Sequence, residues 1–420
     1  MVVSVVATLA AVASCAADSA EAPATGGAER RLSRLSVVPA SVALTPGMVQ
    51  RFSASATWSD GDDSLPSISW SATGGAIDSG GDFVAGDVSG QYRVVAEASG
   101  HADTSVIAIS SADVMPPPDV PATDSGPIPD LGVNASLNGW RPFPENNAWN
   151  TPVDTAQVDP NSAVIIANMN PSATLHPDWG FPPYNSEEYG IPYVVVSGHQ
   201  PKVSILYVAY GAESDPGPYP IPRDAPIEGT VSSTGDRHVI VLDRDNSLLY
   251  ELNQAFPQPD GSWHANSGAI FDLRSNVLRP EGWTSADAAG LPIFPGLVRY
   301  DEVSAGEIRH ALRFTTPRTR KAFVYPARHA ASWITDPGFP PMGMRVRLRR
   351  DFDTSGFAPQ SRIILEALKK YGMILADNGG NWMVSGVTDS RWDEGMLDDF
   401  SKVKGSDFEV VRMGQVVAVP

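Results

Sequence analysis

The sequence predicts a mostly β protein in which a small β-sandwich precedes a larger antiparallel β-sandwich or barrel-like domain with two or three helices. Short runs of alternating polar and apolar residues recur along most of the 420 residues, separated by clusters of Gly, Pro, Asp, Ser and Asn. This is the pattern of β-strands joined by turns. Helical periodicity is rare, and strands do not alternate with helices, which argues against a parallel, doubly wound sheet.

The composition fits a folded protein and argues against nucleic acid as a partner. Hydrophobic residues make up 42% of the chain, and the formal net charge is −18. Binding to nucleic acid needs a basic face that releases counterions, which an acidic chain does not favour. The same charge gives no general attraction to anionic lipid. An alternative interpretation is that an acidic surface simply keeps an exported protein soluble.

The N-terminal segment predicts export and contains the single cysteine, Cys15. Residues 2–14 form an apolar run of the length of a secretory signal, which is too short to span a bilayer stably. The run ends in VASC, which resembles the bacterial lipobox, although no Lys or Arg precedes it. The resemblance implies lipidation of Cys15 and anchoring to a membrane of the cell envelope. The alternative is an ordinary signal peptide, residues 1–15, with a chance cysteine.

Residues 16–33 predict a flexible tether, and residues 34–111 predict a β-sandwich with closely spaced short strands. Within the second range, PASVALTPG, ISWSATGGAID and GDFVAGDVSGQYRVVAEASG resemble the bacterial Ig-like domains of surface proteins. The resemblance implies an Ig-like β-sandwich with Trp70 in its core. Such domains serve as spacers or adhesion modules, so we expect no active site there.

A proline-rich linker, residues 112–137, leads to a C-terminal β-rich domain, residues 138–420. Prolines and small polar residues cannot bury a core and favour an extended spacer. Strand patterns dominate the C-terminal domain, as in HVIVLD at residues 238–243. The clearest helix is predicted at residues 361–372, where an apolar stripe ends at a glycine.

The C-terminal domain resembles a family of secreted bacterial proteins of uncharacterised function. GDRHVIVLD, GWTSADAAGLPIFPGLVRYDE and YGMILADNGGNW carry the resemblance, which spans roughly residues 140–410. Members are often fused to carbohydrate-binding or Ig-like modules, so the resemblance implies export and a glycan target but assigns no catalytic residue. The domain has no P-loop, dinucleotide fingerprint, GxSxG elbow or HExxH motif, which argues against several enzyme classes.

A pair of carboxylates, Glu213 and Asp215, ends a predicted strand. Their i, i+2 spacing would place both side chains on one face of that strand, roughly 7 Å apart. Adjacent carboxylates repel, which raises one pKa and leaves an acid beside a base, as glycoside hydrolysis requires. The alternating prolines that follow would stiffen the frame, and Tyr219 would offer a stacking face to a sugar ring. The alternative is a solvated, inert acidic turn.

Histidines supply a second set of candidate residues. Asp236 and His238 are predicted to share a strand face, where the carboxylate would orient the imidazole; the alternative is a hairpin entrance with a surface histidine. His310 alternates with apolar residues, so it is either catalytic or a core residue, and Arg313 lies on the opposite face as a predicted substrate contact. We expect no cofactor. A metal ion held by Asp236 and the histidines, His329 included, stays open because the spacing is not diagnostic.

Three further residues are predicted to contact substrate. His329 follows a strand end in a loop, and loops on rigid scaffolds often carry function. Asp377 and Trp382, in ADNGGNW, would suit a loop that contacts a sugar. An Asn-Gly turn explains the first part of that motif equally well.

Together these observations favour a lipid-anchored, cell-surface enzyme that acts on extracellular polysaccharide. We expect glycoside hydrolysis with Glu213 or Asp215 as the general acid and Asp236 or His238 as the base or orienting group. A lyase that uses His with Tyr or Arg comes second, and a peptidase or esterase lacks a nucleophile motif. The alternative from another class is a non-catalytic adhesion or glycan-binding protein, which the Ig-like module and the long spacers favour. Catalysis requires these side chains to converge within roughly 10 Å in a concave site.

Overall fold

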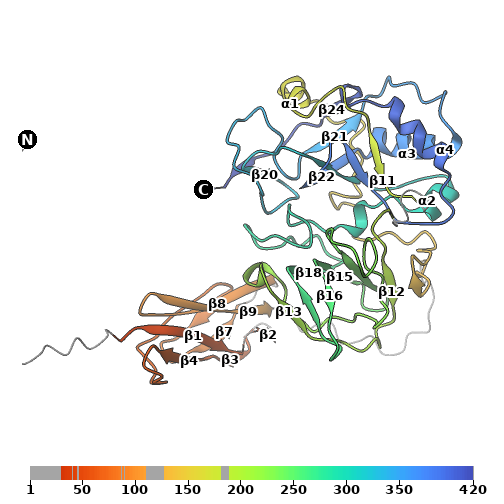
Figure 1. Ribbon diagram of the computed structural model, residues 1–420. Helices are drawn as coiled ribbons and strands as arrows, with labels where there is room; N and C mark the ends of the chain where they lie inside the picture. Colours follow the sequence, from red (N-terminus) through yellow and green to blue (C-terminus); the bar gives the residue numbers. More distant parts are fainter. Residues whose placement is uncertain are drawn as a thin grey trace, which may run out of the picture. The chain divides into compact units, whose positions relative to one another are not determined.

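The computed structural model describes residues 30–39, 41–44, 47–86, 88, 90–109, 127–180 and 189–419. Cys15, the predicted signal and most of the predicted tether and linker lie outside the described residues. The chain divides into two units, residues 1–123 and 124–420, and the division falls inside the predicted proline-rich linker. Strands dominate both units (Figure 1), so the predicted mostly β class is confirmed. Within the described ranges, no helix has the length and apolar character needed to cross a membrane.

The described part of the N-terminal unit contains three small sheets, β1-β4, β2-β9-β8-β5 and β3-β7-β6, around one apolar core. The strands are β1 (Leu32–Val38), β2 (Ser41–Leu44), β3 (Val49–Arg51), β4 (Ser53–Trp58), β5 (Ser69–Ala72), β6 (Gly75–Ile77), β7 (Asp82–Ala85), β8 (Gly90–Ala98) and β9 (His101–Ile109). Phe52 and Phe83 are buried at the centre and meet edge to face. Trp70, expected in the core, is only partly buried, because β5 is an edge strand of its sheet.

The C-terminal unit contains a five-stranded sheet with the order β10-β12-β14-β15-β18. Its strands are β10 (Gly132–Val133), β12 (Val194–Val196), β14 (Val239–Asp243), β15 (Leu248–Asn253) and β18 (Ser267–Asp272). A three-stranded sheet is formed by β13 (Ile205–Tyr207), β17 (Trp263–Ala265) and β16 (Phe256–Pro257). The central strand β14 is buried on both faces: Ile240 and Leu242 belong to one apolar cluster, and Val239 and Val241 to another.

The same unit contains a mixed six-stranded sheet with the order β11-β23-β19-β22-β21-β24. Its strands are β11 (His176–Asp178), β19 (Leu312–Thr316), β21 (Arg345–Leu348), β22 (Met373–Asn378), β23 (Met383–Ser385) and β24 (Phe408–Val410), while β20 (Ala322–Val324) pairs separately with β25 (Val416–Ala418). The pairs β11–β23 and β19–β22 are parallel, and the other neighbours are antiparallel.

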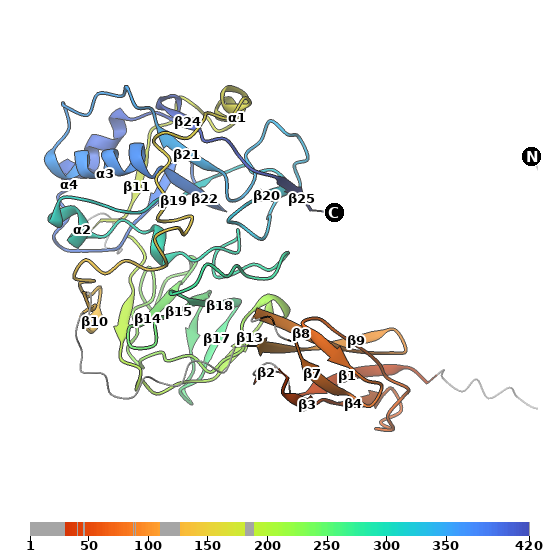
Figure 2. The ribbon, with the colours of Figure 1, turned by 180° about the vertical axis from the view of Figure 1, so that it is seen from behind.

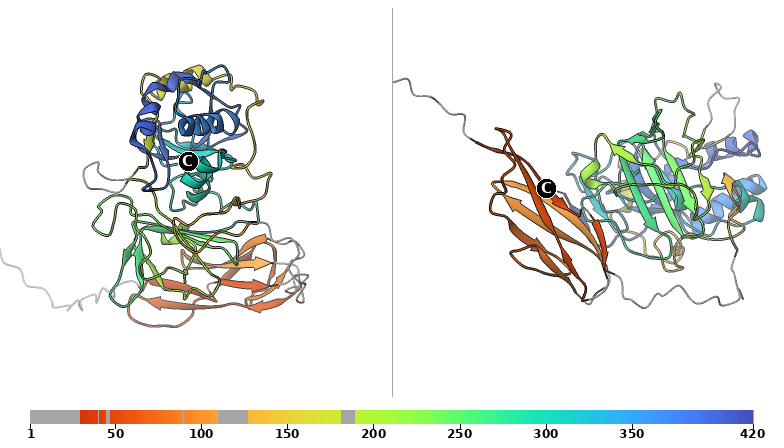
Figure 3. Two further views of the ribbon diagram at one scale, coloured as in Figure 1. Left: turned by 90° about the vertical axis from the view of Figure 1, so that its right-hand side faces the viewer. Right: turned by 90° about the horizontal axis from the view of Figure 1, so that it is seen from below.

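Four α-helices lie in the described part of this unit: α1 (Ser162–Asn168), α2 (Tyr300–Ala305), α3 (Pro359–Lys370) and α4 (Glu394–Asp398). Short 3-10 turns are η1 (Gly211–Glu213), η2 (Phe294–Gly296), η3 (Asp399–Lys402) and η4 (Gly405–Asp407). The helix predicted at residues 361–372 is α3, and Gly372 follows it in the left-handed conformation, with φ +66°. Figures 2 and 3 show α3 and α4 beside the six-stranded sheet, whereas β14, β15 and β18 form a separate group.

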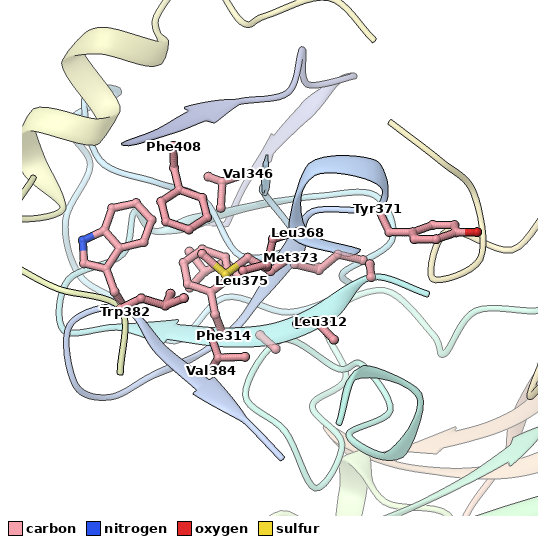
Figure 4. Close-up of a cluster of buried hydrophobic side chains, with 14 of the residues drawn as sticks. Leu312, Phe314, Val346, Leu368, Tyr371, Met373, Leu375, Trp382, Val384 and Phe408 are labelled. Carbon is pink, nitrogen blue, oxygen red and sulfur yellow. The ribbon is translucent and has the colours of Figure 1, made fainter. Parts of the chain in front are cut away.

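The larger apolar core of this unit packs against the six-stranded sheet, and Figure 4 shows its central side chains. Trp382 is 1% exposed, and its ring stacks between Phe314 and Phe408, with centroid distances of 6.0 and 5.1 Å. Its Nε1 donates a hydrogen bond of 2.8 Å to the Met169 carbonyl oxygen. Trp382 is therefore a core residue, and the prediction that it contacts a sugar is wrong because both faces of its ring are covered.

Candidate active site

Three neighbouring strands of the six-stranded sheet bring an arginine, a serine and an aspartate together. Asp178, the last residue of β11, pairs in register with Ser385, the last residue of β23. Arg313 lies on the adjacent strand β19, and its Nη1 donates a hydrogen bond of 2.6 Å to Ser385 Oγ. The parallel pairing of β11 and β23 is what brings two strand ends to the same edge of the sheet.

A β-bulge adds Asp377 to this group. After Phe314 the pairing of β19 with β22 shifts by one residue, so that Thr315 pairs with Asp377 rather than with Ala376. Thr315 and Arg313 share a face, because residues two apart on a strand point the same way. The extra residue therefore turns Asp377 onto the face of Arg313, as bulges near active sites commonly do. Asp377 Oδ2 lies 3.5 Å from Arg313 Nη2.

The Arg313 guanidinium is buried, and other partners already occupy it. Its Nε and Nη2 donate hydrogen bonds of 2.9 and 2.8 Å to the two carboxylate oxygens of Asp287, a bidentate pair. Asp287 has no exposed surface. Burial disfavours the charged guanidinium, but Asp287 outweighs it and raises the pKa of Arg313. Arg313 is thus a fixed cation. Asp287 compensates most of its charge, so Arg313 stabilises an ionised Asp377 only weakly.

The segment that precedes β14 contributes a buried histidine to this site. His238 is 2% exposed, with Nδ1 2.6 Å from Glu228 Oε2 and Nε2 3.1 Å from the Ala286 carbonyl oxygen. Burial opposes protonation, but Glu228 outweighs it and raises the pKa of His238 to about 9. Burial likewise opposes ionisation of Glu228, and His238 nevertheless lowers the pKa of that carboxyl. His238 is therefore an imidazolium ion with both ring protons donated, and it cannot act as a base near neutral pH.

Asp236 does not share a strand face with His238. Arg237, between them, has a left-handed backbone with φ 50°, and β14 begins only at Val239. Arg237 is itself fixed, because its Nε donates 3.1 Å to the Ala255 carbonyl oxygen. As a result His238 points into the protein while Asp236 is exposed. The prediction of a shared face is wrong because a strained turn, rather than a strand, carries these residues.

Two carboxyl groups of this site have raised pKa values. Burial is the main cause at Asp377, whose side chain is 25% exposed; Asp287 adds to the effect, Arg313 opposes it, and Asp236 contributes a smaller repulsion, so that the pKa of Asp377 is about 7. At Asp178 burial again raises the pKa, with Asp236 among the charges that add to it. A carboxyl group of this kind can donate a proton at neutral pH while a neighbouring carboxylate accepts one.

Another buried carboxyl group in this unit is Glu251 on β15. It has no exposed surface, and its oxygens accept hydrogen bonds of 2.9 to 3.0 Å from the backbone N–H groups of Ile293 and Phe294. Burial raises the pKa of Glu251 to about 7, and those two hydrogen bonds oppose the rise. Since no solvent reaches it, Glu251 holds the η2 turn in place rather than exchanging protons with a ligand.

The predicted acid–base pair lies in a different cluster, around Arg279. Glu213 ends the η1 turn, so it and Asp215 do not share a strand face, and that prediction is wrong. Asp215 Oδ2 pairs with Arg279 Nη1 and accepts a hydrogen bond of 2.8 Å from the Ile270 N–H. Glu213 Oε2 accepts one of 3.1 Å from the Thr284 N–H. Both carboxylates thus accept hydrogen bonds from neighbouring segments of the chain. They do not form the predicted pair of a general acid and a general base.

Two more predicted residues are buried apart from Arg313. Tyr219 has no exposed surface, and its hydroxyl donates 3.1 Å to the Asp215 carbonyl oxygen, so it offers no face to a sugar. His310 is 1% exposed, with Nε2 3.1 Å from Glu302 Oε2 and 2.8 Å from Arg299 Nη2. The catalytic interpretation of His310 is wrong and the core interpretation is correct, because its ring has internal partners.

His329 lies beside the cluster, and its Nδ1 donates 2.7 Å to the carbonyl oxygen of Ala288, the residue after Asp287. The structure thus brings together four predicted residues, and it adds four that sequence reasoning missed. This Arg313 site consists of Asp178, Glu228, Asp236, His238, Asp287, Arg313, Asp377 and Ser385. Among the residues that the structure describes, no three His, Cys, Asp or Glu side chains are grouped to hold a metal ion, so Asp236 and the histidines do not form the metal site considered above.

The missed residues left little signal in the sequence. Asp178 ends a strand of three residues, and Ser385 ends another. Asp287 stands in a loop, between Ser285 and Ala288, where small residues suggest only a turn. A polar residue at the end of a short apolar run is a weak indication of a site, and pairing between distant strands was needed to reveal this one.

The chain matches no model of a protein family, and no curated protein is similar to it in sequence. A function must therefore be inferred from the residues of the Arg313 site.

Proposed function

We propose that this protein is an exported, lipid-anchored protein of the bacterial cell envelope whose C-terminal unit hydrolyses glycosidic bonds in extracellular polysaccharide. A lipid on Cys15 would hold it to the membrane, and the N-terminal Ig-like sandwich with the proline-rich linker would act as a spacer. The likeness of residues 12–15 to a lipobox supports the anchor, and the net charge of −18 speaks against a nucleic-acid partner.

One observation carries the catalytic proposal: Asp377 keeps its proton to about pH 7 and remains within reach of solvent, and the exposed Asp236 is near enough to raise its pKa further. Glycoside hydrolases require such a pair, in which a carboxylic acid protonates the leaving oxygen and a carboxylate acts on the opposite side. The bidentate contact between Arg313 and Asp287 supports the proposal because it fixes the sheet edge that bears Asp377.

In the proposed reaction Asp377 donates its proton to the glycosidic oxygen while the bond between that oxygen and the anomeric carbon breaks. Asp236 removes a proton from the water molecule whose oxygen forms the new bond to the anomeric carbon. One product therefore gains a hydroxyl group from water, and the other gains the proton of Asp377. Proton exchange with solvent then restores Asp236 and Asp377 to their starting states.

The test is a measurement of released reducing ends with the purified protein and a panel of polysaccharides. Asp377→Asn should lower kcat by at least ~100-fold, because general acid catalysis contributes this much or more. Glu213→Gln is the matched control, a neutral amide at the other carboxylate cluster, and it should retain activity. Cleavage that survives in Asp377→Asn would contradict the proposal. Polymer binding without any cleavage by the unaltered protein would favour the adhesion alternative.

A further inference from the structure

An exposed indole stands out on the C-terminal unit. Trp333 is 91% exposed, more than any other large hydrophobic side chain among the described residues. Tryptophan is normally well buried because it removes a large apolar area from water. An indole left in solvent gives up that stabilisation, and both faces of its ring are available to a ligand.

The backbone on both sides of Trp333 is fixed. The Ser332 hydroxyl donates to the Thr319 carbonyl oxygen and accepts a hydrogen bond of 3.2 Å from the Ile334 N–H. The Ile334 carbonyl oxygen accepts 2.6 Å from the Lys321 N–H. A ring presented by an ordered loop loses little backbone entropy when a ligand covers it, which favours binding.

This loop, residues 329–334, runs beside the Arg313 site. At its start, the His329 N–H donates 3.2 Å to the Ala289 carbonyl oxygen, and Ala289 N–H in turn donates 2.9 Å to Ala376, the residue before Asp377. Further along, Asn378 Nδ2 donates 2.6 Å to the carbonyl oxygen of Ala331. The loop is therefore attached on both sides of Asp377, and Trp333 follows two residues after the second attachment.

We propose that Trp333 is a substrate-positioning residue that stacks on a sugar ring of the polysaccharide next to the bond that is cleaved. The indole face is flat and apolar and matches the C–H face of a pyranose ring, and its N–H can donate a hydrogen bond to a sugar hydroxyl group. The inference rests on the proposed glycoside hydrolysis and names the substrate more narrowly. The proposed base, Asp236, is an exposed carboxylate of the Arg313 site, and its charge disfavours uronic acids, so the substrate is a neutral or amino-sugar polymer.

Affinity electrophoresis of the whole chain tests this without requiring cleavage. The probes are barley β-glucan, arabinoxylan, glycol chitosan and polygalacturonate, and the protein carries Asp377→Asn so that the polymer stays intact. Adding Trp333→Ala should weaken retention by a neutral or amino-sugar polymer at least ~10-fold, and Trp333→Phe should restore most of it. Tyr210→Ala is the matched control, since Tyr210 is another aromatic side chain that is 52% exposed, and it should bind normally.

The outcomes separate the two proposals. Equal retention of the Trp333→Ala and Trp333 proteins, or no retention on any polymer, would overturn the role of Trp333. Strongest retention on polygalacturonate would overturn the substrate class. If Asp377→Asn still cleaves polymer while Trp333→Ala binds weakly, the catalytic assignment fails and the binding role stands. If Asp377→Asn loses cleavage while Trp333→Ala binds normally, the catalytic assignment stands and the binding role of Trp333 fails.

Discussion

Two clusters in the C-terminal unit each set carboxyl groups around one buried arginine, and they differ in how well the charges balance. In the Arg279 cluster, Asp215 is the ion-pair partner of the guanidinium. The remaining donors reach the carbonyl oxygens of Glu213, at 2.7 Å, and Thr284, at 2.8 Å. One carboxylate thus meets one guanidinium, and the arrangement is complete without a ligand.

In the Arg313 site the carboxyl groups outnumber the two cations, Arg313 and His238. Asp287 takes two guanidinium donors and Ser385 a third, so that Asp377 approaches only to 3.5 Å. Burial disfavours the charged form of Asp377, and the nearby Asp287 adds to this effect, so that Asp377 keeps its proton instead. Two acids that are close in the sequence therefore need not form an acid–base pair, whereas burial in a group with more carboxyl groups than cations raises a carboxyl pKa.

The largest expected effect on stability comes from removing the cation of the Arg313 site. Arg313→Gln leaves Asp287 buried without its bidentate partner, and loss of one member of a buried pair costs about 3–5 kcal/mol in the free energy of unfolding. Urea denaturation measures this. Arg391→Gln is the control: its side chain is 49% exposed, and a surface pair contributes about 0–1 kcal/mol. Similar losses in both variants would show that Arg313 is not a buried structural charge.

The second prediction contrasts the two aspartates directly. Asp215→Asn removes the charge that compensates Arg279, whose side chain is 4% exposed, and should lower the free energy of unfolding by about 1–3 kcal/mol while activity remains. At pH 4.5 Asp377→Asn replaces a group that is already neutral, so its effect on the free energy of unfolding at that pH should stay within about 1 kcal/mol. A larger loss of stability in Asp377→Asn than in Asp215→Asn would contradict the proposed difference between the two aspartates.

The pH dependence of stability sharpens this contrast. Between its ordinary pKa of about 4 and its folded-state pKa of about 7, Asp377 holds a proton in the folded protein that the unfolded chain has lost. Its contribution to the free energy of unfolding therefore decreases as pH rises through this window and levels off above it. Urea denaturation from pH 4.5 to 8 should show wild type losing stability relative to Asp377→Asn. A pH-independent difference between the two proteins would contradict the raised pKa.

The smallest effect is expected at Glu213. Glu213→Gln keeps an oxygen that can accept the hydrogen bond from Thr284, so we expect a change of no more than about 1 kcal/mol in the free energy of unfolding. Reducing-end assays should give wild-type kcat for this variant. A large loss of kcat with intact stability would return Glu213 to the catalytic role that its position in the sequence suggested.

Local patterns in the sequence predicted the elements better than their pairing. Alternation and turn residues predicted the mostly β class, and the apolar stripe with its terminal glycine predicted α3. The parallel pairs β11–β23 and β19–β22 were not predicted, because they join segments that are far apart in the chain. Such non-local pairing depends on how whole faces pack, which no short window of residues records.

The same limit decided which site residues could be found. Residue type alone identified Asp236, His238, Arg313 and Asp377. Their grouping was not predicted, because it depends on the bulge at Ala376, and the sequence around Ala376 looks like an ordinary strand. The carboxylates near the η1 turn misled for the opposite reason. Their spacing was visible, whereas the partner that neutralises Asp215 lies 64 residues further along the chain.

Titration of Asp377 shows whether this carboxyl group holds a proton at neutral pH. Carbon-13 NMR of the aspartate carboxyl resonances, assigned by the signal missing from Asp377→Asn, gives its pKa in the folded protein. Burial of Asp377, together with the neighbouring Asp287, predicts a midpoint of about 7. A midpoint near the ordinary value of about 4 would show that Asp377 is fully ionised at neutral pH, and the proposed general acid would then have no proton to give.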